Sequence, residues 1–95
     1  MNKYEIVFIA QPTLDEESLQ ALMDRYAESV KGLGGLVDQV ENWGKRRLAY
    51  PIHKVQEGFY IVSQVQVGAE TLKELDRSLR LNEQVLRYLI TCGQE

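Results

Sequence analysis

Four segments of the chain alternate between apolar and polar residues, as β-strands do when one face is buried. Residues 3–10 carry Tyr4 and Ile6 on a uniformly apolar face, so we expect that face to meet the core. The alternation is clearest in residues 59–67, and a last strand is predicted over residues 85–92. The fourth segment is longer and less regular than these three.

This longest predicted strand covers residues 36–50. Val37 and Val40 are three positions apart, whereas a regular strand repeats every two residues. One extra residue near Asp38 restores the alternation, so we predict a β-bulge or a strong twist there. A turn over residues 51–58 is expected to lead into the next strand.

Two further segments repeat their apolar residues at helical spacing. Before the first, Thr13 with Glu16 fits a capping box, and Asp15 is an alternative N-cap. The apolar stripe of this helix consists of Leu19, Leu22, Tyr26, Val30 and Leu33. The second helix is predicted over residues 70–81, with Asn82 as a left-handed C-cap.

The resulting order is strand, helix, strand, strand, helix, strand. This is the ferredoxin-like split βαβ pattern (βαββαβ) of an α+β protein. Two right-handed crossovers place both helices on one face of a four-stranded antiparallel sheet. A chain of 95 residues without linkers or repeats is expected to form one domain over residues 1–95.

Composition favours a binding protein of a reducing compartment. Cys92 is the single cysteine, so no internal disulfide forms, and with His53 it is too little for a structural zinc site. We expect no metal, no cofactor, no signal peptide and no membrane span, and therefore a cytoplasmic location. The net charge of −3 means that nucleic acid must be bound through a local patch.

Such a patch is present in the second half of the long strand. Three consecutive cations stand between Trp43 and Tyr50, and a fourth follows closely: Lys45, Arg46, Arg47 and Lys54. Cations beside aromatics suit phosphates and unpaired bases. A charged strand that resists edge pairing explains the same residues equally well. Alternation puts Lys45 and Arg47 on one face and Arg46 on the other.

A second cationic group is predicted from the topology. Lys3 and Arg87 fall on the first and last strands, which are neighbours in this fold, and both are expected to point away from the helices. Arg80, near the end of the second helix, is a further candidate, although it also suits compensation of the helix dipole.

Catalytic signatures are weak in this sequence. His53 has no nucleophile close in sequence, and residues 11–13 lack the arginine of an acylphosphatase phosphate loop. Residues 57–62 match the RRM signature only at Gly58, Phe59 and Val62, so no stacking platform of that kind is expected. We predict no enzymatic activity.

Several motifs together resemble the bacterial ribosomal protein S6 family. The most specific is Gly-Lys-Arg-Arg-Leu-Ala-Tyr-Pro-Ile at residues 44–52. Tyr-Glu-Ile-Val-Phe-Ile at residues 4–9, Pro12, Gly-Phe-Tyr at 58–60 and Val-Leu-Arg-Tyr-Leu-Ile at 85–90 also fit. The resemblance covers essentially the whole chain without an insertion.

The resemblance implies a structural protein of the small ribosomal subunit. Family members bind the central domain of 16S ribosomal RNA as a heterodimer with ribosomal protein S18, and they are not enzymes. On this basis the predicted RNA contacts are Lys3, Lys45, Arg46, Arg47, Lys54, Arg80 and Arg87. The predicted contacts to the protein partner are Trp43, Leu48, Tyr50 and Tyr60. The alternatives are a ferredoxin-like module that binds a small regulatory molecule, and an acylphosphatase-like hydrolase.

Overall fold

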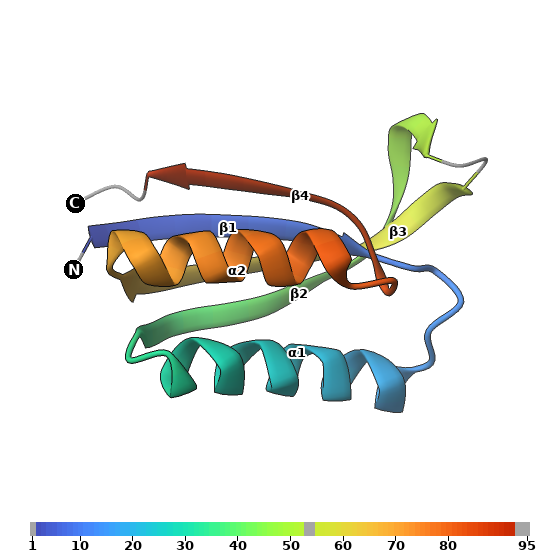
Figure 1. The fold of residues 1–95 in the computed structure, drawn as a ribbon. Coiled ribbons are helices and arrows are strands. Elements are labelled where there is room, and N and C mark those ends of the chain that lie inside the picture. Colours follow the sequence, from blue (N-terminus) through green and yellow to red (C-terminus); the bar gives the residue numbers. More distant parts are fainter. Residues whose placement is uncertain (1, 53–54, 93–95) are drawn as a thin grey trace.

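The protein forms one antiparallel sheet covered by two helices (Figure 1). The computed structural model describes residues 2–52 and 55–92. Along the chain, the elements are β1 (Asn2–Ala10), α1 (Glu16–Gly32), β2 (Leu36–Ile52), β3 (Val55–Val67), α2 (Ala69–Leu81) and β4 (Val85–Cys92). The sheet order is β2-β3-β1-β4, and each pair of neighbouring strands is antiparallel. The ferredoxin-like prediction is confirmed.

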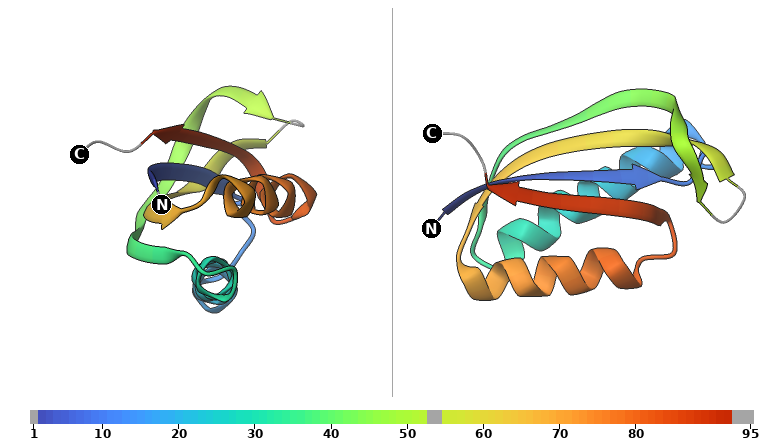
Figure 2. Two further views of the ribbon diagram at one scale, coloured as in Figure 1. Left: turned by 60° about the vertical axis from the view of Figure 1, so that its left-hand side comes forward. Right: turned by 90° about the horizontal axis from the view of Figure 1, so that it is seen from above.

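Both helices lie on the same side of the sheet, and the core fills the space between the two layers (Figure 2). The predicted faces of β1 and β3 point inward, so Phe8 and Ile61 are fully buried. The ring of Phe8 meets that of Tyr26 from α1, with 5.1 Å between centroids. The apolar stripe of α1 faces this core as predicted, except that Leu33 is the exposed C-cap. From α2, Leu75 and Leu79 are buried in the same core.

One polar residue lies in the middle of this apolar layer. Ser63 of β3 is fully buried, and its hydroxyl donates to the carbonyl oxygen of Ile6 at 2.8 Å. A hydroxyl has one proton, so the 2.7 Å contact between Tyr26 Oη and Ser63 Oγ has Tyr26 as its donor. The chain Tyr26–Ser63–Ile6 therefore joins α1, β3 and β1. Burial raises the pKa of Tyr26 to about 12.

The structure shows which of the predicted cap residues end the two helices. Asp15 is the N-cap of α1, and its carboxylate accepts from the Ser18 backbone N–H at 2.7 Å. This hydrogen bond lowers the pKa of Asp15. The left-handed C-cap predicted at Asn82 is wrong, because Asn82 has φ −83° and ψ 115°, an extended conformation. Its side-chain Oδ1 instead accepts from the Gln84 backbone N–H at 2.9 Å, which supports the tight turn into β4.

The hairpin between β2 and β3 is longer than predicted. Both strands extend into the expected turn of residues 51–58, and Ile52 pairs with Val55. Pro51 fits within β2 because β2 is an edge strand with one side free of sheet pairing. The bulge predicted near Asp38 is confirmed by a register shift between Val37 and Gln39. In Figures 1 and 2 the end of the hairpin rises out of the sheet, on the side away from the helices.

Candidate nucleic-acid and partner interface

The basic run lies on the rising part of the hairpin, which we call the basic hairpin and define as residues 43–52 of β2 with residues 55–59 of β3. Lys45, Arg46 and Arg47 are all exposed. Their partners on β3 are Phe59, Gly58 and Glu57, respectively. Phe59 packs toward the helix-side core, so Lys45 and Arg47 point to that side and Arg46 to the open face of the sheet. The predicted alternation of the three cations is confirmed. Lys54 lies outside the described residues.

A second bulge, which the alternation did not predict, sets the geometry of this region. Asn42 pairs with Ile61, and Lys45 pairs with Phe59. Two residues of β2, Trp43 and Gly44, therefore lie opposite one residue of β3, Tyr60. Gly44 has φ +92°, a conformation that other residues rarely adopt, and its N–H donates to Asn42 Oδ1 at 2.8 Å. A glycine inside a strand pattern is the signal in the sequence for such a bulge.

The bulge brings Trp43 and Arg46 to the same face, although they are three residues apart. The Arg46 guanidinium carbon lies 5.4 Å from the centroid of the Trp43 ring. On the other face, Lys45 Nζ lies 5.2 Å from the centroid of Phe59. Each cation–π contact is worth about 0.5–1 kcal/mol at an exposed site. Two of the three described cations of the run therefore contact aromatic rings of the hairpin itself.

The basic hairpin is anchored to the sheet. A Cβ on Gly58 would collide with the side chain of Ile9 and lie 3.0 Å from the Ala10 carbonyl oxygen, so only glycine allows this approach. Leu48 is 9% exposed and belongs to the buried residues of the chain. The exposed cations of the hairpin therefore project from a segment that is itself packed against the sheet.

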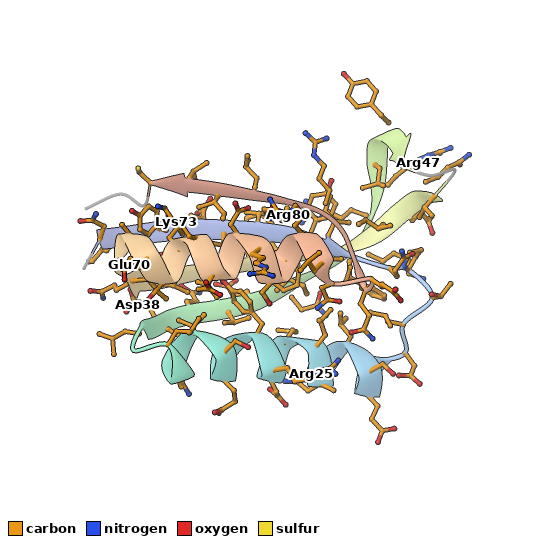
Figure 3. The ribbon with its side chains drawn as sticks, in the orientation of Figure 1. Arg25, Asp38, Arg47, Glu70, Lys73 and Arg80 are labelled. Carbon is orange, nitrogen blue, oxygen red and sulfur yellow. The ribbon has the colours of Figure 1, made fainter. Side chains whose placement is uncertain are left out.

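The other predicted cations are spread over the molecule. Lys3 and Arg87 both belong to the open face, because Lys3 alternates with inward-facing residues of β1 and Arg87 pairs with Ile9. Lys3 and Ile9 are six positions apart on β1, which is about 20 Å at roughly 3.3 Å per residue. Figure 3 shows that Arg80 comes from α2, whereas Arg47 extends from the basic hairpin. The structure thus does not bring Lys3, Arg80 and Arg87 together.

Arg80 has a local role on the helix side. Tyr88 of β4 donates a hydrogen bond to the carboxylate of Asp76 on α2. This bond raises the pKa of Tyr88, and the positive charge of Arg80 opposes the rise. Arg80 therefore lies close to this Tyr–Asp pair, in the last turn of its helix, where a cation also offsets the dipole.

An apolar row crosses the open face next to the hairpin. Val62, Val7 and Leu89 are direct cross-strand neighbours on β3, β1 and β4, and Leu89 is 60% exposed. One step toward the hairpin, Tyr60, Ile9 and Arg87 form the neighbouring row. One step away, the row is polar and consists of Gln64, Glu5 and Thr91. Sequence analysis missed the apolar row because it depends on the register between three strands.

The four residues predicted to contact a protein partner differ in their accessibility. Trp43 is 50% and Tyr50 74% exposed. Tyr60 is half-buried on the open face, beside Ile9. Leu48 packs within the chain and is not available to a partner in this conformation.

Metal ions and membranes were also considered for the described part of the chain. No group of three or more side chains there is arranged to hold a metal ion. Within residues 2–52 and 55–92, no helix is long and apolar enough to span a membrane. The basic hairpin, with the open sheet face beside it, combines exposed cations with exposed aromatic rings.

Comparison with known proteins decides the family. The family model described as ribosomal protein S6 matches residues 3–91, which is nearly the whole chain. The chain belongs to the ribosomal protein S6 family. Two curated relatives are small ribosomal subunit proteins bS6, from Clostridium botulinum strain Hall at 46% identity and from Clostridium acetobutylicum at 44%. The first alignment covers 95% of this chain and 96% of the relative, and the second 95% of each.

A solved structure of the S6 family agrees with this assignment. The crystal structure of 30S ribosomal protein S6 from Thermotoga maritima superposes with a TM-score of 0.90 at 30% identity. The alignment covers 97% of this chain and 87% of that protein. The resemblance inferred from the sequence motifs is confirmed, and with it the assignment to the ribosomal proteins of the bacterial small subunit. Bacterial ribosomes are cytoplasmic, which agrees with the predicted location.

Proposed function

We propose that this S6-family chain binds the central domain of 16S ribosomal RNA as a heterodimer with ribosomal protein S18. In this proposal the chain is a structural constituent of the small subunit and has no enzymatic activity. The observation that carries the proposal is the basic hairpin: Lys45, Arg46 and Arg47 are exposed and flanked by exposed aromatics on an acidic chain.

The distribution of charge supports a fixed orientation on RNA. From Asp15 to the end of α1 the sequence has five acidic and two basic residues, an excess equal to the whole net charge of −3. In Figure 1, α1 lies on the opposite side of the molecule from the basic hairpin. An orientation with the hairpin toward the RNA places this acidic helix away from the phosphates, which lowers the repulsion.

The open face supports a protein partner beside the RNA. The apolar row of Val62, Val7 and Leu89 lies one row away from Tyr60, which faces the Trp43–Gly44 bulge. Interfaces commonly have an apolar centre with aromatic anchors and a charged rim. A partner that covers this row lies against the basic hairpin, and a cationic partner there adds positive charge where the RNA binds.

Copurification tests the proposal in its simplest form. The tagged native chain is isolated from cells at moderate salt, and associated RNA and proteins are identified. We expect 16S ribosomal RNA and S18 in the wild-type sample, and less RNA with Arg46→Glu/Arg47→Glu. The matched control, Lys73→Glu/Arg77→Glu, makes the same charge change on α2 and should recover RNA as the wild type does. Recovery of S18-free chain without ribosomal RNA would contradict the proposal.

A further inference from the structure

Trp43 differs in exposure from the aromatic side chains of the helix-side core, which are buried. It also differs from an ordinary exposed apolar residue. It is half exposed, but exposure of a single ring is common and carries no function alone. What distinguishes Trp43 is that two contacts restrain its ring. Its indole N–H donates to Glu41 Oε2 at 3.2 Å, and Arg46 lies against its ring.

The backbone under this ring is also constrained. The bulge at Gly44, with its hydrogen bond to Asn42 Oδ1, determines the direction in which Trp43 leaves the strand. A ligand that meets an already ordered ring loses little conformational entropy on binding. These contacts favour one orientation of the ring on the open face.

The two cation–π pairs of the hairpin offer different chemistry. In the first pair, Phe59 is half-buried against the core and its cation is Lys45, which has no planar group. In the second pair, both the indole of Trp43 and the guanidinium of Arg46 are planar, and both belong to exposed residues. Nucleobases stack on aromatic rings and on arginine planes, whereas paired and stacked bases in a helix offer no free face.

The position of β2 at the edge of the sheet lets one nucleotide use both faces of the strand. β2 is an edge strand, so a base placed over Trp43 and Arg46 on the open face would have its phosphate near the free edge of β2. On the other face of the same segment, Lys45 and Arg47 are exposed. We infer that Trp43 and Arg46 form a stacking site for one unpaired nucleobase, flanked by Lys45 and Arg47 for the adjacent phosphates. The inference rests on the proposed function.

Affinity measurements with substituted chains test the stacking site. The chain in complex with S18 is titrated with a 16S central-domain RNA fragment. Stacking on an aromatic side chain accounts for about 5- to 150-fold in affinity, so Trp43→Leu should weaken binding by a factor in this range. Trp43→Phe keeps a ring and should lose less. Arg46→Lys keeps the charge, so the salt dependence should stay unchanged while affinity falls.

A spectroscopic readout separates stacking from packing against S18. Trp43 is the single tryptophan of the chain, so 5-fluorotryptophan gives one fluorine resonance from this site. The stacking site assigns Trp43 to RNA, whereas the sequence prediction placed it among the contacts to the protein partner. We therefore expect little change when unlabelled S18 is added and a clear shift when RNA follows. A shift complete with S18 alone, or wild-type affinity of Trp43→Leu for RNA, would overturn the stacking site and leave the proposed function standing. Absence of RNA binding by the wild-type pair would overturn both.

Discussion

The helix-side core and the basic hairpin use the same residue types in opposite ways. Phe8 and Tyr26 are buried ring against ring, and the polar atoms of Tyr26 and Ser63 are paired with each other and with Ile6. In the hairpin, Trp43 and Tyr50 remain exposed beside exposed cations. The core has already gained its contact energy on folding. In the proposed function the exposed rings and charges of the hairpin contact RNA, so substitutions in the two regions should have separable effects.

Removal of one ring from each region should give the largest contrast. Phe8→Ala leaves a cavity in a packed core and should lower the free energy of unfolding by about 3–5 kcal/mol. Trp43→Ala removes one exposed cation–π contact and should cost only about 0.5–1 kcal/mol. Urea denaturation followed by circular dichroism measures both. Equal losses for the two variants would contradict the division between core and hairpin.

Alkaline pH should lower the free energy of unfolding through ionisation of Tyr26 in the core. The folded pKa of Tyr26 is about 12, above its ordinary value of 10.0, so its contribution is complete below pH 10 and is lost as pH rises toward 12. A shift of this size corresponds to about 2–3 kcal/mol. Tyr88, whose pKa is also raised, adds to the loss in the same direction.

Denaturation at pH 8 and near pH 12 measures this alkaline loss. Tyr26→Phe removes the ionisable hydroxyl and should show a smaller loss. Tyr50→Phe, the matched change at an exposed hairpin residue, should lose as much as the wild type. A wild-type loss in Tyr26→Phe would mean that another group causes the pH dependence.

The two candidate N-cap residues of α1, Asp15 and Thr13, allow a test with a smaller effect. Only substitution of Asp15 should lower the free energy of unfolding. Asp15→Ala removes the acceptor of the Ser18 N–H and should cost about 1 kcal/mol. Thr13→Ala should change stability by less than about 0.5 kcal/mol, because Thr13 is exposed and does not cap the helix. Thermal or urea unfolding separates the two variants, and a larger loss in Thr13→Ala would show that the capping is assigned to the wrong residue.

Charge reversal on the basic hairpin should have a small effect on stability and a clear effect on RNA binding. Arg46→Glu/Arg47→Glu should lower the free energy of unfolding by only about 0.5–1 kcal/mol, since both side chains are exposed and the contact between Arg46 and Trp43 is the one that is lost. In the complex with S18, each lost phosphate contact should reduce the salt slope of RNA binding by roughly 0.7–0.9. Lys73→Glu/Arg77→Glu on α2 should leave the slope unchanged. An unchanged slope in the hairpin variant would mean that these arginines do not contact phosphates.

Local patterns in the sequence predicted most of the fold. The stripe of Leu19, Leu22 and Tyr26 predicted the buried face of α1, and the irregular spacing of Val37 and Val40 predicted the first bulge. Features that depend on pairing between distant segments were missed. The partner of Ser63 is 37 residues away on another element, and the row of Val62, Val7 and Leu89 exists only in the final register.

The candidate site was predictable in composition but not in geometry. The sequence located the cations of residues 45–47, and alternation assigned their faces. It did not predict that a bulge would pair Trp43 with Arg46, because one additional residue reverses the face of every side chain beyond it. It also gave no reason to separate Leu48, which packs within the chain, from exposed Tyr50.

The central claim is that an acidic chain binds ribosomal RNA tightly only together with a basic partner. A filter-binding titration of a 16S central-domain fragment, with and without S18, tests it most directly. Alone, three exposed hairpin cations on a chain of net charge −3 should give weak binding, with a Kd of roughly 10⁻⁴ to 10⁻⁶ M at physiological salt. With S18 present, binding should tighten by tenfold or more. If the chain alone binds the fragment as tightly as the pair does, the account is contradicted.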